Sequence, residues 1–359
     1  MPERSVLFGT QRESGADFME FRGREVPKRF TSLDEEYAAL GHEAGLLDLS
    51  VQGVVELRGR DRSRFLHGMV TNDIRSLSPG QGCYALMLTP QGRILTDMRV
   101  LCLEEALMLL VDADLVEKDL ALLRRYIIAD QVEVIDRSAD LAILSLQGPR
   151  AAEVIAGLCR GTSPPEAPFE HRLIQVGNLP VRCARVRRTA SGGCDLIVPE
   201  SQSVDLWNLL LQAGKPAGLR PVGLAAWNVR RLEAGIPWYG IDMDEARIPL
   251  ETGLEEAISY SKGCYIGQEV VARATFRGHV NRKLTGLLLS SGEPARGGDK
   301  IFRNGQEVGW VTDSAYSPGL RRAIALAYVR KEAWDPGTSV GVDSGGVRTD
   351  AEVTQYPFD

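Results

Sequence analysis

The sequence contains no apolar run long enough to span a bilayer, and neither half of the chain is strongly basic. Residues 1–21 carry early acidic side chains and lack the apolar segment of a secretory signal. We therefore expect a cytoplasmic protein with no membrane partner. A formal net charge of −6 argues against a protein that coats nucleic acid, although it leaves a local contact with tRNA open.

Cysteine pairs of the CxxC type are absent as well. The six cysteines stand at positions 83, 102, 159, 183, 194 and 264. This spacing argues against a zinc ribbon or a self-contained iron–sulfur site, so we predict no metal centre. Scattered cysteines in a chain without a leader are typical of reduced thiols in a cytosol-like compartment.

A chain of 359 residues is too long for one ordinary core, so two or three domains are expected. Over most of the chain, the order of strands and helices predicts antiparallel sheets with helices on one face, which is an α+β fold. Residues 284–359 have short strands, Gly-rich turns and little helix, and they predict an all-β module that starts near Arg282. Residues 1–33 are polar and are expected to be irregular.

Local patterns predict several individual elements. Residues 34–46 predict a short helix that ends at Gly45, and the apolar run after it predicts strand with a turn or bulge at Gly53. Asp61 is a suitable cap for the helix that follows it. Residues 201–214 predict a helix with a serine cap and a glycine end.

Residues 83–103 predict a β-hairpin that turns at Pro90-Gln91-Gly92. Its second strand alternates, but Asp97 interrupts the apolar face. A carboxylate inside an apolar strand needs a partner, because burying it alone is costly. The alternation by itself slightly favours the simpler interpretation, in which Asp97 faces water.

The segment Lys262–Arg273, KGCYIGQEVVAR, places Cys264 between two glycines, Gly263 and Gly267. Closely spaced glycines let the backbone take positive φ and approach a ligand. The ammonium of Lys262 would lower the pKa of a neighbouring thiol and so favour the reactive thiolate. The spacing alone slightly favours a tight turn that holds a small, half-buried cysteine.

KGCYIGQEVVARATFRG resembles the signature of the YgfZ family, folate-binding relatives of the glycine-cleavage T-protein (aminomethyltransferase) that support iron–sulfur proteins. Further blocks resemble T-protein segments, and together they cover the chain from about residue 34 to residue 330; they include LTPQGRILTDMRV, RLEAGIPWYG and VTDSAYSPGLRRAIALAYV. The resemblance implies two α+β domains (1–137 and 138–282) and a C-terminal β-barrel (283–359). It also implies that the three domains form a ring around a central channel that holds tetrahydrofolate or another reduced folate.

The resemblance also suggests roles for single residues. Asp97 falls where the T-protein has an acid facing the reactive end of the folate, although the acid before it is here Thr96. Asp195 falls where a glutamate reads the pterin, whose adjacent N–H donors suit a carboxylate; otherwise it is an ordinary acid at a strand edge. Tyr84 and Tyr239 match aromatic positions near the folate, unless they are simply core residues.

In the signature, Cys264 is the expected functional thiol, with Lys262 keeping it reactive. The expected folate contacts are Gly263, Gln268, Glu269, Arg273 and Arg277. The two arginines would meet the anionic glutamate tail of a folate or an acidic partner. The alternative for such basic residues is a solvated surface.

Three departures from the T-protein pattern favour the YgfZ family. Trp227, followed by Asn228, stands where the T-protein has an arginine; residues 48–52 lack its histidine; and Cys264-Tyr265 replace an aspartate-phenylalanine pair. The main prediction is therefore a tetrahydrofolate-binding protein that supports iron–sulfur cluster assembly or repair through transient contact with client or assembly proteins. The alternatives are a tetrahydrofolate-dependent aminomethyltransferase or methyltransferase, and a binding module in which Cys264 only packs. Whether catalysis occurs stays open at this point.

Overall fold

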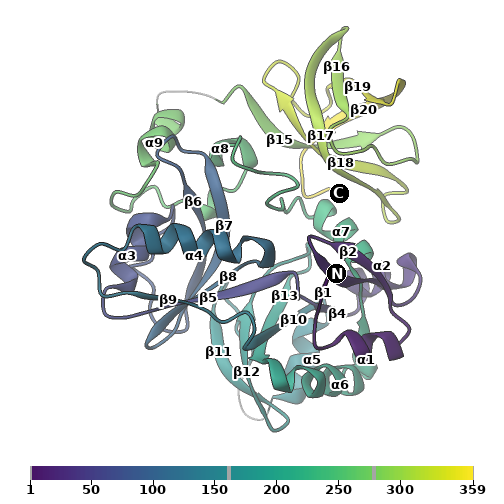
Figure 1. The fold of residues 1–359 in the computed structure, drawn as a ribbon. Coiled ribbons are helices and arrows are strands. Elements are labelled where there is room, and N and C mark those ends of the chain that lie inside the picture. Colours follow the sequence, from purple (N-terminus) through teal and green to yellow (C-terminus); the bar gives the residue numbers. More distant parts are fainter. Residues whose placement is uncertain (1, 160–162, 277–279, 359) are drawn as a thin grey trace. The chain divides into compact units, whose positions relative to one another are not determined.

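The computed structural model describes residues 2–159, 163–276 and 280–358 (Figure 1). The chain divides into two compact units, each of which is described by itself. Unit 1 comprises Met1–Ala85 and Thr96–Trp227, and unit 2 comprises Leu86–Leu95 and Asn228–Asp359. None of the described helices is long and apolar enough to cross a membrane.

The first sheet of unit 1 has five strands in the order β6-β7-β8-β5-β9. Their bounds are β5 Gln52–Arg58, β6 Gly82–Leu88, β7 Ile94–Cys102, β8 Ala106–Asp112 and β9 Glu133–Asp136. The pairs β7–β8, β8–β5 and β5–β9 are antiparallel. The helices α3 (Arg62–Met69) and α4 (Val116–Arg125, after the turn η1, Ala113–Leu115) pack on this sheet. The hairpin expected over residues 83–103 is therefore confirmed as β6 and β7.

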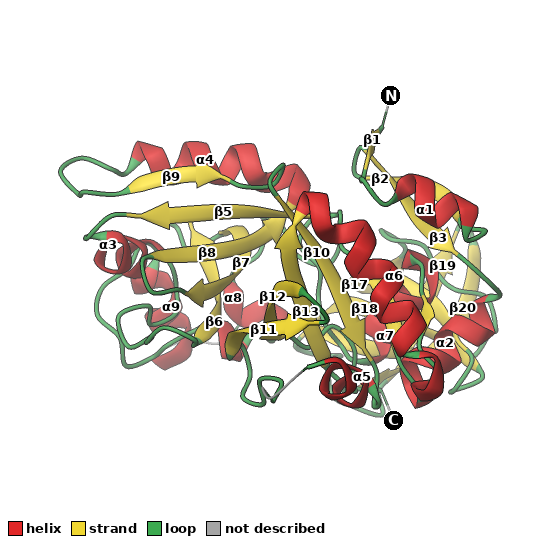
Figure 2. Cartoon of the chain, turned by 90° about the horizontal axis from the view of Figure 1, so that it is seen from below, coloured by secondary structure: helices red, strands yellow, loops and turns green. Residues whose placement is uncertain are grey.

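The second sheet has six strands in the order β11-β12-β13-β10-β4-β14. Their bounds are β4 Gly45–Asp48, β10 Leu141–Gln147, β11 His171–Val176, β12 Leu179–Arg185, β13 Gly193–Pro199 and β14 Arg220–Pro221. Helices α5 (Ala151–Leu158) and α6 (Ser203–Ala213) lie side by side on it (Figure 2). Trp207 of α6 is fully buried in the core between these helices and the sheet. Short helices η2 (Glu200–Gln202) and η3 (Lys215–Ala217) flank α6.

The prediction that residues 1–33 are irregular is wrong. They form the strands β1 (Glu3–Arg4), β2 (Asp17–Phe21) and β3 (Arg24–Arg29) and the helix α1 (Phe8–Glu13). Arg22 and Gly23 join β2 to β3 with φ of 51° and 76°, as a tight hairpin turn requires. These elements are short and lack a strong periodic pattern of apolar residues. The hydrogen-bonded pairing of β2 with β3 stabilises the two strands.

Three local predictions need correction. The helix α2 (Leu33–His42) ends before Gly45, which opens β4, and it is capped by Ser32. Gly53 lies inside β5 and not in a turn. A side chain is excluded at this position because a Cβ there would come 2.3 Å from the Val116 side chain of α4. The side chains of Asp61 and of the serine that opens α6 do not cap their helices; the Asp61 carboxylate accepts a hydrogen bond from the Gln131 N–H instead.

Unit 2 contains a closed barrel in the order β15-β18-β17-β16-β19-β20, which confirms the predicted all-β module. The strands are β15 Arg282–Leu289, β16 Lys300–Arg303, β17 Gln306–Ser317, β18 Arg322–Arg330, β19 Ser339–Ser344 and β20 Val347–Thr354. The helices of this part of the chain are α7 (Leu224–Glu233, which starts in unit 1), α8 (Pro249–Thr252), η4 (Glu255–Ala257) and α9 (Gln268–Phe276), and α8 contacts β15 of the barrel. The α+β fold with a C-terminal β-barrel is thus confirmed, while the ring and the boundaries at 137 and 282 stay predictions.

Candidate functional site

Asp97 lies on β7 and is buried, with 9% of its surface exposed. Its Oδ2 accepts a 2.6 Å hydrogen bond from the hydroxyl of Tyr84 on β6. Burial, followed by the neighbouring Asp97 carboxylate, raises the pKa of Tyr84 well above its usual value, so the phenol keeps its proton and can donate. The interpretation that Asp97 faces water is therefore wrong.

A second carboxylate lies behind the hairpin. Thr96, where the resemblance led us to look for a second acid, places its Oγ1 3.1 Å from Oδ2 of Asp119 on α4. Asp119 is fully buried, and this burial raises its pKa to about 7, although the Thr96 hydroxyl acts in the opposite direction. The hairpin itself supplies one acid, but the helix beside it supplies another.

Asp195 lies on β13 and is fully buried against Arg188. Arg188 donates from Nη2 to Oδ2 at 2.7 Å and from Nε to Oδ1 at 2.9 Å, and Ser145 Oγ donates to Oδ1 at 2.7 Å. Both oxygens are thus engaged in a bidentate ion pair. In this arrangement, Asp195 can accept the N–H donors of a pterin only if Arg188 withdraws.

Trp227, which stands where the resemblance leads us to expect an arginine, takes part in the same cluster. Its indole N–H donates a 3.2 Å hydrogen bond to the main-chain oxygen of Arg188, and the side chain is buried. The residue therefore helps to hold the segment that carries Arg188.

The sequence reasoning missed Arg99, which is two residues after Asp97 and so projects from the same face of β7. Its guanidinium carbon lies 5.4 Å from the centre of the Tyr84 ring, and the side chain is half-buried. Burial acts to lower the pKa of Arg99, but Tyr84, Asp97, Asp195 and Asp112 together raise it above its ordinary value. The sequence did contain a signal for it, because Arg99 follows Asp97 by two residues on a predicted strand and so shares its face.

The signature residues lie in unit 2. Cys264 is exposed rather than half-buried. Lys262 is buried, and its ammonium lies 4.9 Å from the centre of the Tyr265 ring. Gly263 is exposed. Gly267 has φ of 84°, and a Cβ there would come 2.6 Å from the main-chain oxygen of Thr89, so this glycine allows close approach to the tip of the β6–β7 hairpin.

The polar signature residues that follow lie on α9. Gln268 is its first residue, and Glu269 and Arg273 form an exposed 2.7 Å ion pair one turn apart. Such pairs contribute little to stability because both charges stay hydrated. Arg277 lies outside the described residues.

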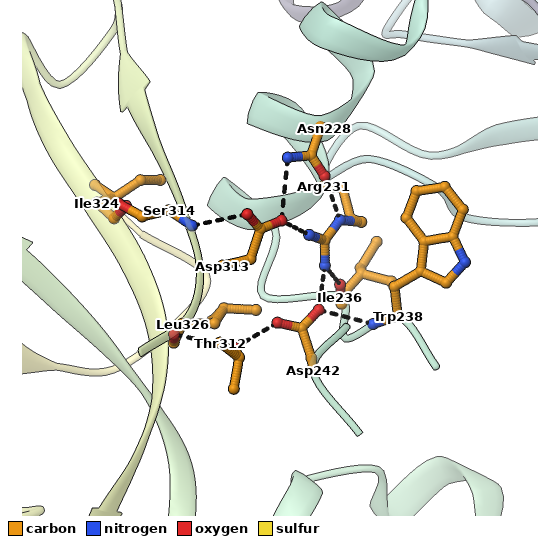
Figure 3. Close-up of polar contacts among 10 residues, drawn as sticks. All are labelled: Asn228, Arg231, Ile236, Trp238, Asp242, Thr312, Asp313, Ser314, Ile324 and Leu326. Atoms are coloured by element: carbon orange, nitrogen blue, oxygen red, sulfur yellow. Dashed lines mark hydrogen bonds and ion pairs between the residues drawn. The ribbon is translucent and has the colours of Figure 1, made fainter. Parts of the chain in front are cut away.

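Tyr239 is buried and forms a bridge to Met243, in a loop held by a polar network within unit 2. Figure 3 shows Arg231 of α7 between Asp242 of this loop and Asp313 of β17, with ion pairs to both. Asp242 also accepts a 2.9 Å hydrogen bond from the Trp238 N–H. The network fixes the loop that carries Tyr239 against the barrel.

Two groups of predicted residues thus emerge, each within one unit. Unit 1 brings together Tyr84, Asp97 and Asp195, with Arg99 and Arg188 beside them. Unit 2 carries the signature residues and Tyr239.

Comparisons with known proteins bear on both units. The GCVT N-terminal domain family matches residues 7–262, and the glycine cleavage T-protein C-terminal barrel domain matches residues 282–359. The chain is 33% identical to an aminomethyltransferase of Geobacillus sp. (strain WCH70), over 100% of this chain and 99% of that protein. It is 32% identical to an aminomethyltransferase of Bacillus subtilis (strain 168), with the same coverage.

The fold also resembles a solved structure. The glycine cleavage system aminomethyltransferase T from Bartonella henselae superposes with a TM-score of 0.91 at 26% identity, covering 100% of this chain and 98% of that one. Matches to both domain families, identities above 30% over the full length and a shared fold all agree. The chain therefore belongs to the glycine cleavage T-protein (aminomethyltransferase) family.

Proposed function

We propose that this protein transfers a one-carbon unit from an amine to a reduced folate, as an aminomethyltransferase or a closely related methyltransferase. Tetrahydrofolate is the cofactor of this family, and the relatives described above are named aminomethyltransferases. When bound, reduced folate supplies amine nitrogens that accept a one-carbon unit. The observation that carries the proposal is Asp97, a buried carboxylate anchored through one oxygen by Tyr84.

The residues of unit 1 fit a ligand with N–H donors at Asp97. Tyr84 donates to Oδ2, and among the described residues Oδ1 accepts no hydrogen bond. That oxygen is left to accept a proton or an N–H from a bound amine. The Tyr84 ring beside it suits a flat heterocycle. A ligand can donate to Asp195 only if Arg188 moves away, because Arg188 is hydrogen-bonded to both carboxylate oxygens.

Asp97 performs the proton handling in this proposal. A transferred one-carbon unit replaces a proton on the accepting nitrogen, and the departing amine must gain one. A single buried carboxylate with one fixed and one open oxygen can hold that proton between the two nitrogens. The hydrogen bond from Tyr84 keeps the carboxylate in one orientation while this happens.

The test is turnover of N-methylated amines, with and without a carboxylate, in the presence of tetrahydrofolate. Methyl-tetrahydrofolate and the demethylated amine should form with the wild type, because the methyl group leaves one nitrogen for the other without a change of oxidation state. Asp97→Asn should keep folate binding and lose about 100-fold or more in turnover, in line with general acid–base roles. Glu105→Gln, an exposed change just beyond the same hairpin, is the control. Equal turnover by Asp97→Asn and the wild type would contradict the proposal.

A second candidate function is the YgfZ-type support of iron–sulfur clients, and the exposed thiol of Cys264 favours it. An accessible thiol can contact a client or assembly protein transiently, in the cytoplasm that we expect for this chain. Cells carrying Cys264→Ser should then lose activity of iron–sulfur enzymes, whereas Cys102→Ser, a buried thiol, should not. Full activity of those enzymes in the Cys264→Ser strain would remove this candidate.

A further inference from the structure

We propose that Asp97 and Arg99 bind the two ends of a small zwitterionic amine, with the ammonium on Asp97 and the carboxylate on Arg99. The inference rests on the proposed function and names the class of the donor: a free amino acid with a transferable carbon on its nitrogen. The observation behind it is a half-buried arginine with which none of the described residues forms a salt bridge.

Arg99 makes neither an ion pair nor a side-chain hydrogen bond with any of the described residues. Its guanidinium carbon lies over the face of Tyr84, 5.4 Å from the ring centre. A guanidinium stays charged at any physiological pH and has five N–H donors to satisfy. Holding such a group in a half-buried position without a partner is costly, and this is typical of a site that awaits a ligand.

The nearby carboxylates do not need Arg99 as a counterion. Asp112 is bound by Arg22 at 2.6 Å and by the amide of Gln52. Asp195 is bound by Arg188 and Ser145. Asp97 differs from these two: among the described residues, the hydrogen-bond partner of its carboxylate is the neutral hydroxyl of Tyr84, and no cation is paired with it. Within the described residues, an arginine without a salt bridge and a carboxylate without a salt bridge therefore stand two residues apart on β7.

Tyr84 fixes the positions of the two groups relative to each other. Its hydroxyl donates to Asp97, and its ring lies beside Arg99. Residues two apart on a strand project from the same face, at Cα positions roughly 6.6 Å apart. The Asp97 carboxylate and the Arg99 guanidinium therefore both lie beside the Tyr84 side chain. This arrangement suits a short molecule with opposite charges at its two ends. An amine that carries no carboxylate would leave the guanidinium unpaired.

We assign the carboxylate that pairs with Arg99 to the donor rather than to the folate. Asp97 matches the family position that faces the reactive end of the folate, whereas the carboxylates of a folate lie on its glutamate tail, at the opposite end. A carboxylate beside Asp97 thus belongs to the molecule that gives up the carbon.

The experiment is calorimetric titration of the full chain with N,N-dimethylglycine and with its methyl ester, which lacks the carboxylate. The wild type should bind the acid about 10- to 100-fold more tightly than the ester, as expected for charge-assisted hydrogen bonds. Arg99→Met should abolish this preference without changing affinity for the ester, and Arg99→Lys should keep part of it. Arg125→Met, an exposed arginine on α4, is the control.

Several outcomes would overturn the assignment. Equal binding of acid and ester by the wild type would do so, as would an unchanged preference in Arg99→Met. The same holds if Arg99→Met weakens binding of 5-formyltetrahydrofolate but not of 6-methyltetrahydropterin, which has no carboxylate, because Arg99 would then serve the folate tail. A wild type that binds no folate yet prefers the acid would contradict the proposed function while supporting this assignment.

Discussion

Replacing Asp119 by asparagine should stabilise the protein above neutral pH. Asp119 is fully buried on α4, and one of its carboxylate oxygens, Oδ1, lacks a hydrogen-bond partner in the described part of the chain. Burial raises the pKa of Asp119 to about 7, from an ordinary value of 3.8. Above pH 7 the folded protein therefore has to hold an ionised carboxylate in a poorly solvated place.

The sign of the pH dependence follows from proton linkage. The unfolded chain releases the Asp119 proton near pH 4, whereas the folded chain keeps it to about pH 7. The folded state thus binds more protons between these values, so the contribution of Asp119 to stability falls as pH rises through this window. At about 1.4 kcal/mol for each tenfold change in ionisation, the upper limit of the loss is roughly 4 kcal/mol. Local relaxation reduces this, and we expect about 2 kcal/mol.

The assay is urea unfolding followed by tryptophan fluorescence at pH 4.5, 6 and 8. Asp119→Asn should match the wild type at pH 4.5 and exceed it by about 2 kcal/mol at pH 8. Glu117→Gln, an exposed change on the same helix, should show no such divergence. Burial, followed by Arg182, lowers the pKa of His171 to about 4, and this opposes the slope in wild type and variant alike. The difference between the two proteins is therefore the quantity to measure, and a difference that does not grow with pH would refute the reasoning.

Three further predictions concern the cluster, the signature and the barrel network. Asp195→Asn should change affinity for 5-formyltetrahydrofolate by less than about twofold, because Arg188 already takes both oxygens; a tenfold loss in a binding titration would show that Arg188 withdraws. Gly267→Ala should lower stability by about 1–3 kcal/mol in urea unfolding, since φ is 84° and the added Cβ meets the Thr89 oxygen, whereas Gly9→Ala, with open space around it, should not. Arg231→Met should cost about 3–5 kcal/mol by leaving the buried Asp242 and the partly buried Asp313 without their cation, and a loss below 1 kcal/mol would contradict the assigned role of these ion pairs.

The elements with a strong local pattern could be predicted from the sequence. The hairpin β6–β7 has alternation and a Pro-Gln-Gly turn, and the barrel has short strands with Gly-rich turns. The three short strands before residue 30 were missed because pairing between them, and not periodicity, stabilises them. Gly53 was misplaced because a glycine in a strand can mark either a turn or the close approach of another element, here the Val116 side chain.

The chemistry of the site was less predictable than its position. Asp97 and Tyr84 were named from the sequence, and the structure joins them by a hydrogen bond. That Arg188 saturates Asp195 could not be read from sequence, because the ion pair depends on how the loop after β12 folds back toward β13. Arg99 was overlooked because its significance lies in the partner it lacks, and only the packed structure shows which carboxylates are already taken.

The most direct test of the proposed function is to follow a ¹³C label from the N-methyl carbon of N,N-dimethylglycine by NMR, with tetrahydrofolate as acceptor. This exchange breaks one carbon–nitrogen bond, forms another and leaves N-methylglycine, so it needs no oxidant. We predict that the label appears on the folate with the wild type and is retained on the donor with Asp97→Asn. Tight folate binding by the wild type without any movement of label, from this donor or from any other N-methylated amine, would contradict it.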